Sequence, residues 1–349
     1  MPTPIPLTLE KQTLADRILA DGWLDETELA SLRRQVFADG IVDADEVDLL
    51  FYLDTHAEST AVDWPEFFIG ALTDFFVWKQ FPPAVLSEEA GKLLVDRVTA
   101  DGKIKAATEF ELLRNIIKHA KLVPDDVVCL ALEGVKDTVL AGGGTLFGPD
   151  RRRAGVMDDG DVEVVRDIIY GIGGGDGFVV SRREAELLFD LHRATRAKRN
   201  APGWGELFVK GIGNFLMFPR RQATVSDADL RRREAWLADR GGNKAAFIAK
   251  MGAALGSGAA LSEAFDLGAA ASGHAVTGED QAYMQKLDHD AALAEELARV
   301  DDDEAAWLLA QIGPAAGLHE DEIALLTFIR ENTTAISPAL DPIFQAAGL

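Results

Sequence analysis

The fold of this chain is decided by a short phrase that first reads Ala20-Asp21-Gly22-Trp23-Leu24-Asp25-Glu26-Thr27-Glu28. It returns as Ala38-Asp39-Gly40-Ile41-Val42-Asp43-Ala44-Asp45-Glu46, as Ala100-Asp101-Gly102-Lys103-Ile104 followed by Glu109, and in a weaker form as Asp176-Gly177-Phe178-Val179-Val180-Ser181-Arg182-Arg183-Glu184. A phrase that recurs along a chain is the signature of a repeated structural unit. Here it predicts linked helical hairpins with acidic corners.

Local physical chemistry explains the phrase. Glycine suits the residue just past a helix C-terminus, where φ is often positive. A side chain that can cap the next helix follows, and three residues later comes a glutamate, in the spacing of a capping box. These pairs are Asp25 with Glu28, Asp43 with Glu46, and Ser181 with Glu184. Apolar residues then recur at helical spacing and strand patterns are almost absent, so we predict an all-α fold.

The sequence also contains a longer duplication, which includes copies of the short phrase. The stretch Trp64-Pro65-Glu66-Phe67-Phe68-Ile69 is echoed 140 residues later by Trp204-Gly205-Glu206-Leu207-Phe208-Val209, and the C-terminal segment from Leu308 resembles the segment from Leu93. We therefore predict two related multi-helix units, at 1–140 and 158–349, joined by a Gly/Arg-rich linker at 141–157. The second unit carries an insertion at about 236–300. The aromatic segment from Trp64 to Phe81 is predicted to be a central core helix, because both copies contain it.

Composition narrows the function. The chain has 349 residues and a formal net charge of −23. Such an excess of acid repels nucleic acid and attracts cations and basic surfaces, so no nucleic-acid partner is expected. Cys129 is the single cysteine and lies in an apolar run, which excludes an internal disulfide and predicts core packing. No signal peptide or membrane-spanning segment is evident, which predicts a cytoplasmic protein; peripheral membrane contact stays open.

The acidic corners are candidate cation sites. Hard cations such as Ca²⁺ take several carboxylate and carbonyl oxygens, and each corner offers both. An EF-hand is excluded, because its first and third positions would fall on Arg17 and Leu19 in one corner and on Gln35 and Phe37 in the next. Helix capping and a solvated acidic face explain the same spacing without any metal. The sequence leaves both interpretations open.

No catalytic constellation is recognisable. The six histidines are scattered, with no pair at metal-ligand spacing, and no nucleophile elbow or phosphate-binding loop is present. Basic residues concentrate in the middle of the chain, where they could bind an acidic protein partner or form a solvated linker. The clearest clusters are Arg151, Arg152 and Arg153, and then Arg231, Arg232 and Arg233.

The corner phrase, followed by paired leucines, resembles the TerB family of tellurite-resistance proteins, best at residues 33–53 and 94–117. The resemblance implies an acidic, all-helical protein linked to divalent-cation handling and to stress- or envelope-associated complexes. It places cation contacts on Asp39, Asp43, Glu46, Asp101 and Glu109. This chain departs from a single domain of that family in its length, its duplication and its insertion, and Ser181 takes the place of Asp43 in the second copy.

Three functions follow as hypotheses. The first is a non-enzymatic TerB-like scaffold or adaptor whose acidic corners bind Ca²⁺ or another divalent cation, or a protein partner. Its metal-site residues would be Asp21, Asp25, Glu28, Asp39, Asp43, Glu46, Asp101 and Glu109. The second is a purely structural interaction module with no cation site. The third is an enzyme with an unrecognised site between the two domains.

Overall fold

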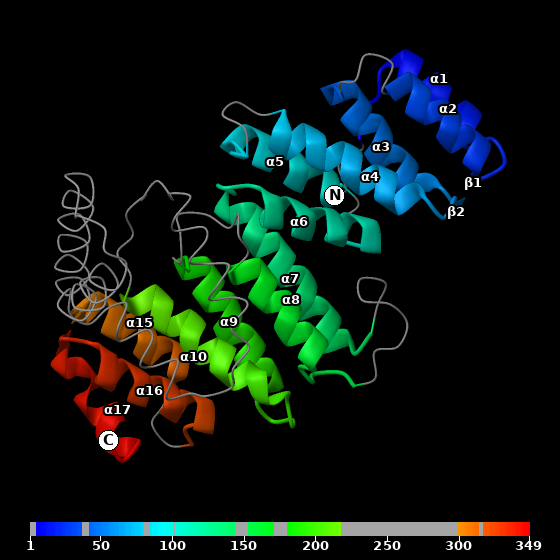
Figure 1. Cartoon of the computed structure of the whole chain (residues 1–349). Helices are drawn as coiled ribbons and strands as arrows, with labels where there is room; N and C mark the ends of the chain where they lie inside the picture. The colour runs from blue at the N-terminus through cyan, green and yellow to red at the C-terminus, as the bar shows by residue number, and fades with distance from the viewer. Residues whose placement is uncertain are drawn as a thin grey trace, which may run out of the picture. The chain divides into compact units, whose positions relative to one another are not determined.

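The computed structural model confirms the all-α class (Figure 1). It describes residues 5–36, 42–79, 84–100, 102–143, 153–170, 180–217, 299–313 and 317–349. The chain divides into two compact units. The first contains the described elements up to Leu207 except Val180. The second contains Val180, the remainder of the helix that continues from Phe208, and the described residues from Arg299 onward.

The first unit is a succession of helices, several of which begin at a residue whose side chain caps the helix. Side chains of Thr8, Asp43, Ser87 and Ser181 each accept a backbone N–H in the first turn that follows, which satisfies a donor that has no partner within the helix. The helices are α1 (Leu9–Ile18), α2 (Glu26–Val36), α3 (Ala44–His56), α4 (Trp64–Thr73), α5 (Glu88–Val98), α6 (Ala107–His119), α7 (Asp125–Ala141), α8 (Asp159–Tyr170), α9 (Arg182–Thr195) and the start of α10 (Pro202–Met217).

Short parallel pairings close the hairpins. Strand β1 (Trp23–Leu24) pairs with β2 (Ser59–Thr60), so the chain before α2 meets the chain after α3. A single parallel bridge between Val85 and Leu122 does the same around α5 and α6. Each hairpin is thus closed at its open end by main-chain hydrogen bonds. Two-residue strands are too short to show alternation, and the sequence did not predict them.

The helices of the first unit stack in chain order. Helix α1 packs on α3, α3 on α5, α5 on α7 and α7 on α9, while α4 packs on α6 and α6 on α8. Most helices therefore contact the helix two positions further along, and Figure 1 shows this succession from α1 in blue to α9 in green. Stacking of this kind buries a continuous core, because each hairpin covers the apolar face of the one before it.

The aromatic segment is a core helix, as predicted. Trp64, Phe68 and Phe76 are almost completely buried. The helix α4 continues as a π-helical turn, η1 (Asp74–Trp78), at whose end Trp78 is 50% exposed beside the ring of His119. Cys129 is buried on α7 and carries no disulfide, which confirms its predicted place in the core.

The second unit repeats the closed hairpin. Strand β3 (Arg299–Val300) pairs in parallel with β4 (Ala335–Ile336) on either side of α15 (Asp302–Ile312) and α16 (Glu320–Asn332). The chain then ends in η3 (Pro338–Leu340) and α17 (Asp341–Ala346). Gly213 of α10 brings that helix close to α16, since a Cβ there would lie 2.3 Å from Cε1 of Phe328. Almost all of the predicted insertion at 236–300 lies outside the described residues.

Candidate functional site

The first acidic corner joins α1 to α2 and uses its acids to cap a helix. Asp25 Oδ1 accepts the N–H of Glu28 at 2.8 Å, and Glu28 Oε2 accepts the N–H of Asp25 at 3.0 Å. This is the capping box that the sequence predicts. Asp21 Oδ1 accepts the N–H of Trp23 at 3.0 Å. Asp21 and Asp25 remain exposed, so the corner is still open to a ligand from solvent.

A further acid lies at this corner. Glu58 precedes β2, and its N–H donates to the carbonyl oxygen of Gly22 at 2.9 Å. Its carboxyl group lies over Gly22, where a Cβ would be 3.1 Å from the Glu58 Cδ. Gly22 has a φ of +82°, so glycine is required here both by the turn and by the approach of Glu58. The parallel pairing of β1 with β2 therefore adds an acid that is distant in sequence.

The second corner is also built on a capping box. Asp43 Oδ1 accepts the N–H of Glu46 at 2.8 Å, and Glu46 Oε2 accepts the N–H of Asp43 at 3.1 Å. The other Glu46 oxygen receives the ammonium of Lys11 at 3.3 Å, which brings α1 against the start of α3. Asp45 is exposed. Asp39, the remaining predicted ligand of this corner, lies outside the described residues.

The third corner joins α5 to α6 and places Glu109 against the backbone. Glu109 Oε2 accepts the N–H groups of Lys105 at 3.2 Å and of Ala106 at 3.1 Å, and the side chain is buried. Gly102 has the predicted positive φ, +109°, but it lies three residues past Thr99, the C-cap of α5, and not directly after the helix. Asp101, the second predicted ligand here, lies outside the described residues.

Within the described parts of the chain, no corner gathers three His, Cys, Asp or Glu side chains whose ligand atoms all lie within 4.8 Å of one another. The capping boxes account for the orientation of Asp25, Glu28, Asp43 and Glu46. A cation at one of these corners would therefore need carbonyl oxygens or water for most of its coordination shell. The predicted Ca²⁺ site stays a prediction.

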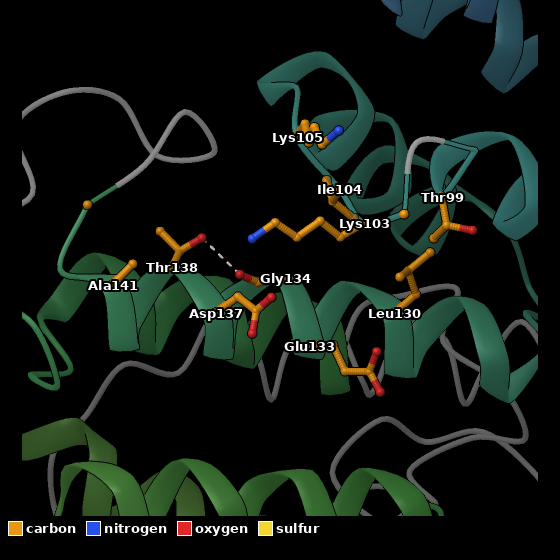
Figure 2. Close-up of a pocket in the computed structure, with 12 residues that line it drawn as sticks. Thr99, Lys103, Ile104, Lys105, Leu130, Glu133, Gly134, Asp137, Thr138 and Ala141 are labelled. Atoms are coloured by element: carbon orange, nitrogen blue, oxygen red, sulfur yellow. Dashed lines mark hydrogen bonds between the residues drawn. The ribbon is translucent and has the colours of Figure 1, made fainter. Parts of the chain in front are cut away.

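A cleft of about 450 Å³, called here the α7 groove, lies beside the third corner (Figure 2). One wall is a stripe of α7 residues spaced three or four apart, and the other is the loop between α5 and α6. Figure 2 shows the Lys103 side chain extending from that loop over α7. The residues that line the groove are Thr99, Gly102, Lys103, Ile104, Lys105, Leu130, Glu133, Gly134, Asp137, Thr138, Ala141 and Gly143.

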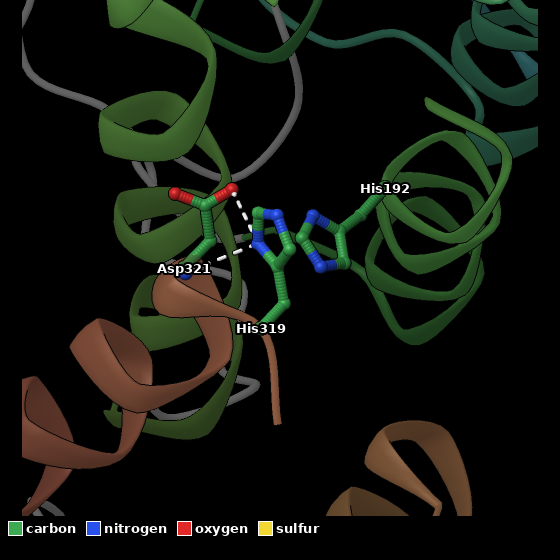
Figure 3. A group of neighbouring side chains, drawn as sticks. All are labelled: His192, His319 and Asp321. Carbon is green, nitrogen blue, oxygen red and sulfur yellow. Dashed lines mark hydrogen bonds and ion pairs between the residues drawn. The ribbon is translucent and has the colours of Figure 1, made fainter. Parts of the chain in front are cut away.

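In the second unit, a histidine caps a helix. His319 Nδ1 accepts the N–H of Asp321 at 3.3 Å and lies 3.2 Å from the Asp321 carboxylate, at the start of α16 (Figure 3). Glu322 completes this cap, because its Oε2 accepts the N–H of His319 at 2.8 Å. His192, also drawn in Figure 3, belongs to α9 of the first unit and is fully buried there.

No family model, curated protein or solved structure matches this chain. The TerB-like assignment therefore stays a prediction from the corner phrase. None of the helices in the described ranges is both long enough and apolar enough to cross a membrane.

The predicted basic partner surface falls mostly outside the described residues. Arg151, Arg152 and Arg231 to Arg233 are not among them, and Arg153 is exposed at the end of the linker. Two basic residues of α9 make local ion pairs, Arg182 with Glu186 at 3.0 Å and Arg193 with Asp190 at 2.5 Å, while Arg183 pairs with Asp125 and Asp126 at the start of α7. Part of the basic middle is therefore neutralised by the protein itself.

Sequence reasoning missed two of these features. Glu58 reaches the first corner only through the pairing of β1 with β2, and its own sequence context shows no motif. The α7 groove combines a loop with one stripe of a later helix, so no local pattern marks it. A weak signal did exist in Gly134, an isolated glycine inside a helical pattern, which often has a packing or functional reason.

Proposed function

We propose that this chain is a non-enzymatic acidic scaffold whose exposed corners bind a basic segment of a partner protein. The observation that carries the proposal is the arrangement of the first two corners. Asp21 and Asp25 are exposed at the start of α2, and Asp43 and Asp45 are exposed at the start of α3, the two helices of the hairpin that β1 and β2 close; capping boxes hold both helix starts in place. Stacked helical hairpins offer extended surfaces of this kind to other proteins. A net charge of −23 adds long-range attraction for a basic partner.

The framework makes a clean test possible. Asparagine is about as good an N-cap as aspartate, so Asp→Asn changes remove charge while they keep the helices capped. The test variant carries Asp21→Asn, Asp25→Asn, Asp43→Asn and Asp45→Asn. The control variant carries Asp16→Asn and Glu66→Gln, which neutralise an exposed acid within α1 and another in the first turn of α4, both outside the two corners. Binding of a fluorescent Lys/Arg-rich peptide is measured by anisotropy at two salt concentrations.

We expect the corner variant to bind the peptide at least tenfold more weakly at low salt, and the control to lose much less per charge removed. The affinity of the unaltered chain should also fall as salt rises, because exposed charges are screened within about 10 Å at 0.1 M. Equal losses in the two variants, per charge removed, would mean that net charge alone attracts the peptide. The corners would then not be the binding surface.

A divalent cation is the second candidate occupant of the first corner. The observation in its favour is Glu58, whose carboxyl group lies over Gly22, the residue that follows Asp21 in the same corner. A cation that binds only the folded state raises the unfolding midpoint, by about 2.7 kcal/mol of stabilisation at a hundred times its Kd. Thermal unfolding in EDTA is compared with unfolding in millimolar Ca²⁺, Mg²⁺ and Mn²⁺. A rise in the unfolding midpoint that Glu58→Gln abolishes supports the site. If none of the ions raises the midpoint, the corner is not a cation site.

A further inference from the structure

The α7 groove contains charges that no side chain neutralises. Lys103, Glu133 and Asp137 make no hydrogen bond or ion pair with another residue in the described part of the chain. Their neighbour Lys136, one residue from Asp137 on α7, pairs instead with Asp190 at 3.1 Å. Two exposed anions and one exposed cation therefore line one cleft without a side-chain partner in the described part of the chain.

The walls between these charges are apolar or already satisfied. Ile104 is buried, and Leu130 lies on α7 one turn before Gly134. The Thr138 hydroxyl donates to the Gly134 carbonyl oxygen at 2.9 Å, so this polar group is occupied (Figure 2). Gly134 lets the Ile104 side chain pack directly on α7 at the floor, because a Cβ there would lie 2.9 Å from the Ile104 Cδ1. The groove thus combines an apolar floor with a few charged groups, which is typical of sites for small ligands.

The spacing of the charges defines the ligand. Glu133 and Asp137 are four residues apart on a helix, so their Cβ atoms lie about 5–6 Å apart on one face. Lys103 enters from the opposite wall. A ligand that satisfies all three needs two cationic groups about one helical turn apart and one anionic group. A free basic amino acid has this combination, since its ammonium and its side-chain cation are separated by an apolar stem and its carboxylate is adjacent to the ammonium.

We propose that the α7 groove binds free arginine or lysine. Lys103 holds the ligand carboxylate, Glu133 and Asp137 hold the two cationic groups, and the aliphatic stem lies on Ile104 and Leu130. Hydrogen bonds between oppositely charged groups are stronger than neutral ones, which favours a ligand that uses all three contacts. A cavity of about 450 Å³ is within the size range of small-ligand sites. The groove and the acidic corners share no proposed ligand-binding residue, so this inference does not rest on the proposed function.

The test uses three probes and the full chain. L-arginine carries all three charged groups, agmatine lacks the carboxylate, and N-acetyl-L-arginine lacks the free ammonium. Isothermal titration calorimetry at neutral pH measures each affinity. We expect L-arginine to bind about tenfold more tightly than either of the other two probes. L-glutamate, with its net negative charge, should give no measurable binding.

Variants assign each contact. Lys103→Met should remove the preference for L-arginine over agmatine, and Asp137→Asn should weaken both ligands about tenfold. Lys92→Met is the matched control, since Lys92 is an exposed lysine on α5 paired with Asp96 at 2.7 Å and is absent from the groove. Lys103 and Asp137 are both exposed, so the variants should fold normally, and unfolding midpoints check this. Equal affinity of the unaltered chain for L-arginine and agmatine, or no heat with L-arginine at 10 mM, overturns the proposal.

Discussion

Two regions of the first unit have the same apolar framework and different polar contents. The first is α3 with α4, and the second is α9 with the start of α10. Phe51 and Trp64 in the first, and Phe189 and Trp204 in the second, are all almost completely buried. Both α3 and α9 begin with a capping box in which a serine or aspartate is paired with a glutamate. The comparison separates the buried aromatic positions that the two regions share from the polar positions at which they differ.

The polar residue inside the framework differs between the two regions. Asp54, three residues after Phe51, accepts a hydrogen bond from the Trp64 indole at 2.7 Å and another from the Thr108 hydroxyl at 2.6 Å. Burial raises the pKa of this carboxyl group, while the two hydrogen bonds lower it. His192 has the corresponding position, three residues after Phe189, and is completely buried. The aromatic framework therefore persists around an aspartate in one region and a histidine in the other.

The capping glutamates differ in a second way. Glu46 and Glu184 are each 8% exposed, and each accepts the N–H of its N-cap residue. Glu46 also pairs with Lys11. Burial raises the pKa of Glu184, the hydrogen bond from the Ser181 N–H lowers it, and Asp125 raises it by more than Arg183 lowers it, so that the pKa is about 7. The two glutamates thus make the same capping hydrogen bond in different surroundings. Glu46 has the ammonium group of Lys11 beside its carboxyl group, whereas burial is the largest influence on the carboxyl group of Glu184.

The largest effect is expected from Asp54→Ala. This change removes the acceptor for the Trp64 indole and the Thr108 hydroxyl, and it leaves the buried indole and the half-buried hydroxyl without this partner. Unsatisfied buried donors cost about 1–3 kcal/mol each, so we expect a loss of roughly 2–4 kcal/mol in the free energy of unfolding. Urea denaturation followed by circular dichroism measures the loss.

Thr108→Ala is the matched control for that prediction. It removes one hydrogen bond to Asp54 and no tryptophan contact, so it should cost about 1 kcal/mol. If both variants unfold at the same urea concentration as the unaltered chain, Asp54 does not hold the three helices together. The contrast with His192 would then have no energetic meaning.

Most of the fold was predictable because it depends on local rules. The capping boxes at Asp25, Asp43 and Ser181 and the positive φ angles of Gly22 and Gly102 follow from residues close in sequence. The buried aromatic helix from Trp64 follows from its composition. The parallel bridge between Val85 and Leu122 did not follow, because it joins single residues 37 positions apart. The duplication stays a prediction, although the shared framework is compatible with it.

Less of the candidate site was predictable, because it depends on which helices meet. The sequence placed Asp21, Asp25 and Glu28 at one corner, and the structure agrees. It could not place Lys11 on Glu46 or Glu58 on Gly22, since both contacts come from the packing of hairpins. A carboxylate that can cap a helix can also bind a cation, so the residue type alone does not distinguish the two roles. Geometry that forms only in three dimensions separates the two roles.

A smaller effect, which depends on pH, is expected from Glu184→Gln. Because the folded pKa of Glu184 is about 7 and the ordinary value is 4.5, the folded chain holds this proton more tightly than the unfolded chain does. The contribution of this group to stability is therefore fully present below about pH 4.5 and is lost as pH rises to about 7. Glutamine keeps the capping hydrogen bonds and has no charge to bury. We expect the variant to match the unaltered chain at pH 5 and to exceed it by about 1–3 kcal/mol at pH 8.

Glu46→Gln provides the comparison for Glu184→Gln. This glutamate has the same exposure and the same cap geometry, but its substitution removes the ion pair with Lys11. Urea denaturation of both variants between pH 5 and pH 8 gives the two profiles. A gain in stability at pH 8 for Glu46→Gln as large as for Glu184→Gln would show that Lys11 does not compensate the first cap.

A still smaller effect is expected from Lys11→Met, which leaves Glu46 in its cap without the ammonium group. The two side chains are 20% and 11% exposed, so solvent screens their attraction only in part. Partly screened ion pairs contribute about 0.5–1 kcal/mol, and added salt should reduce this difference. Lys92→Met removes a more exposed ion pair, with Asp96 on α5, and should cost about 0.3–0.5 kcal/mol or less. Equal losses for the two lysines, with equal salt dependence, would mean that the first cap owes nothing particular to Lys11, and the difference between the two hairpins would then arise from Asp125 beside Glu184.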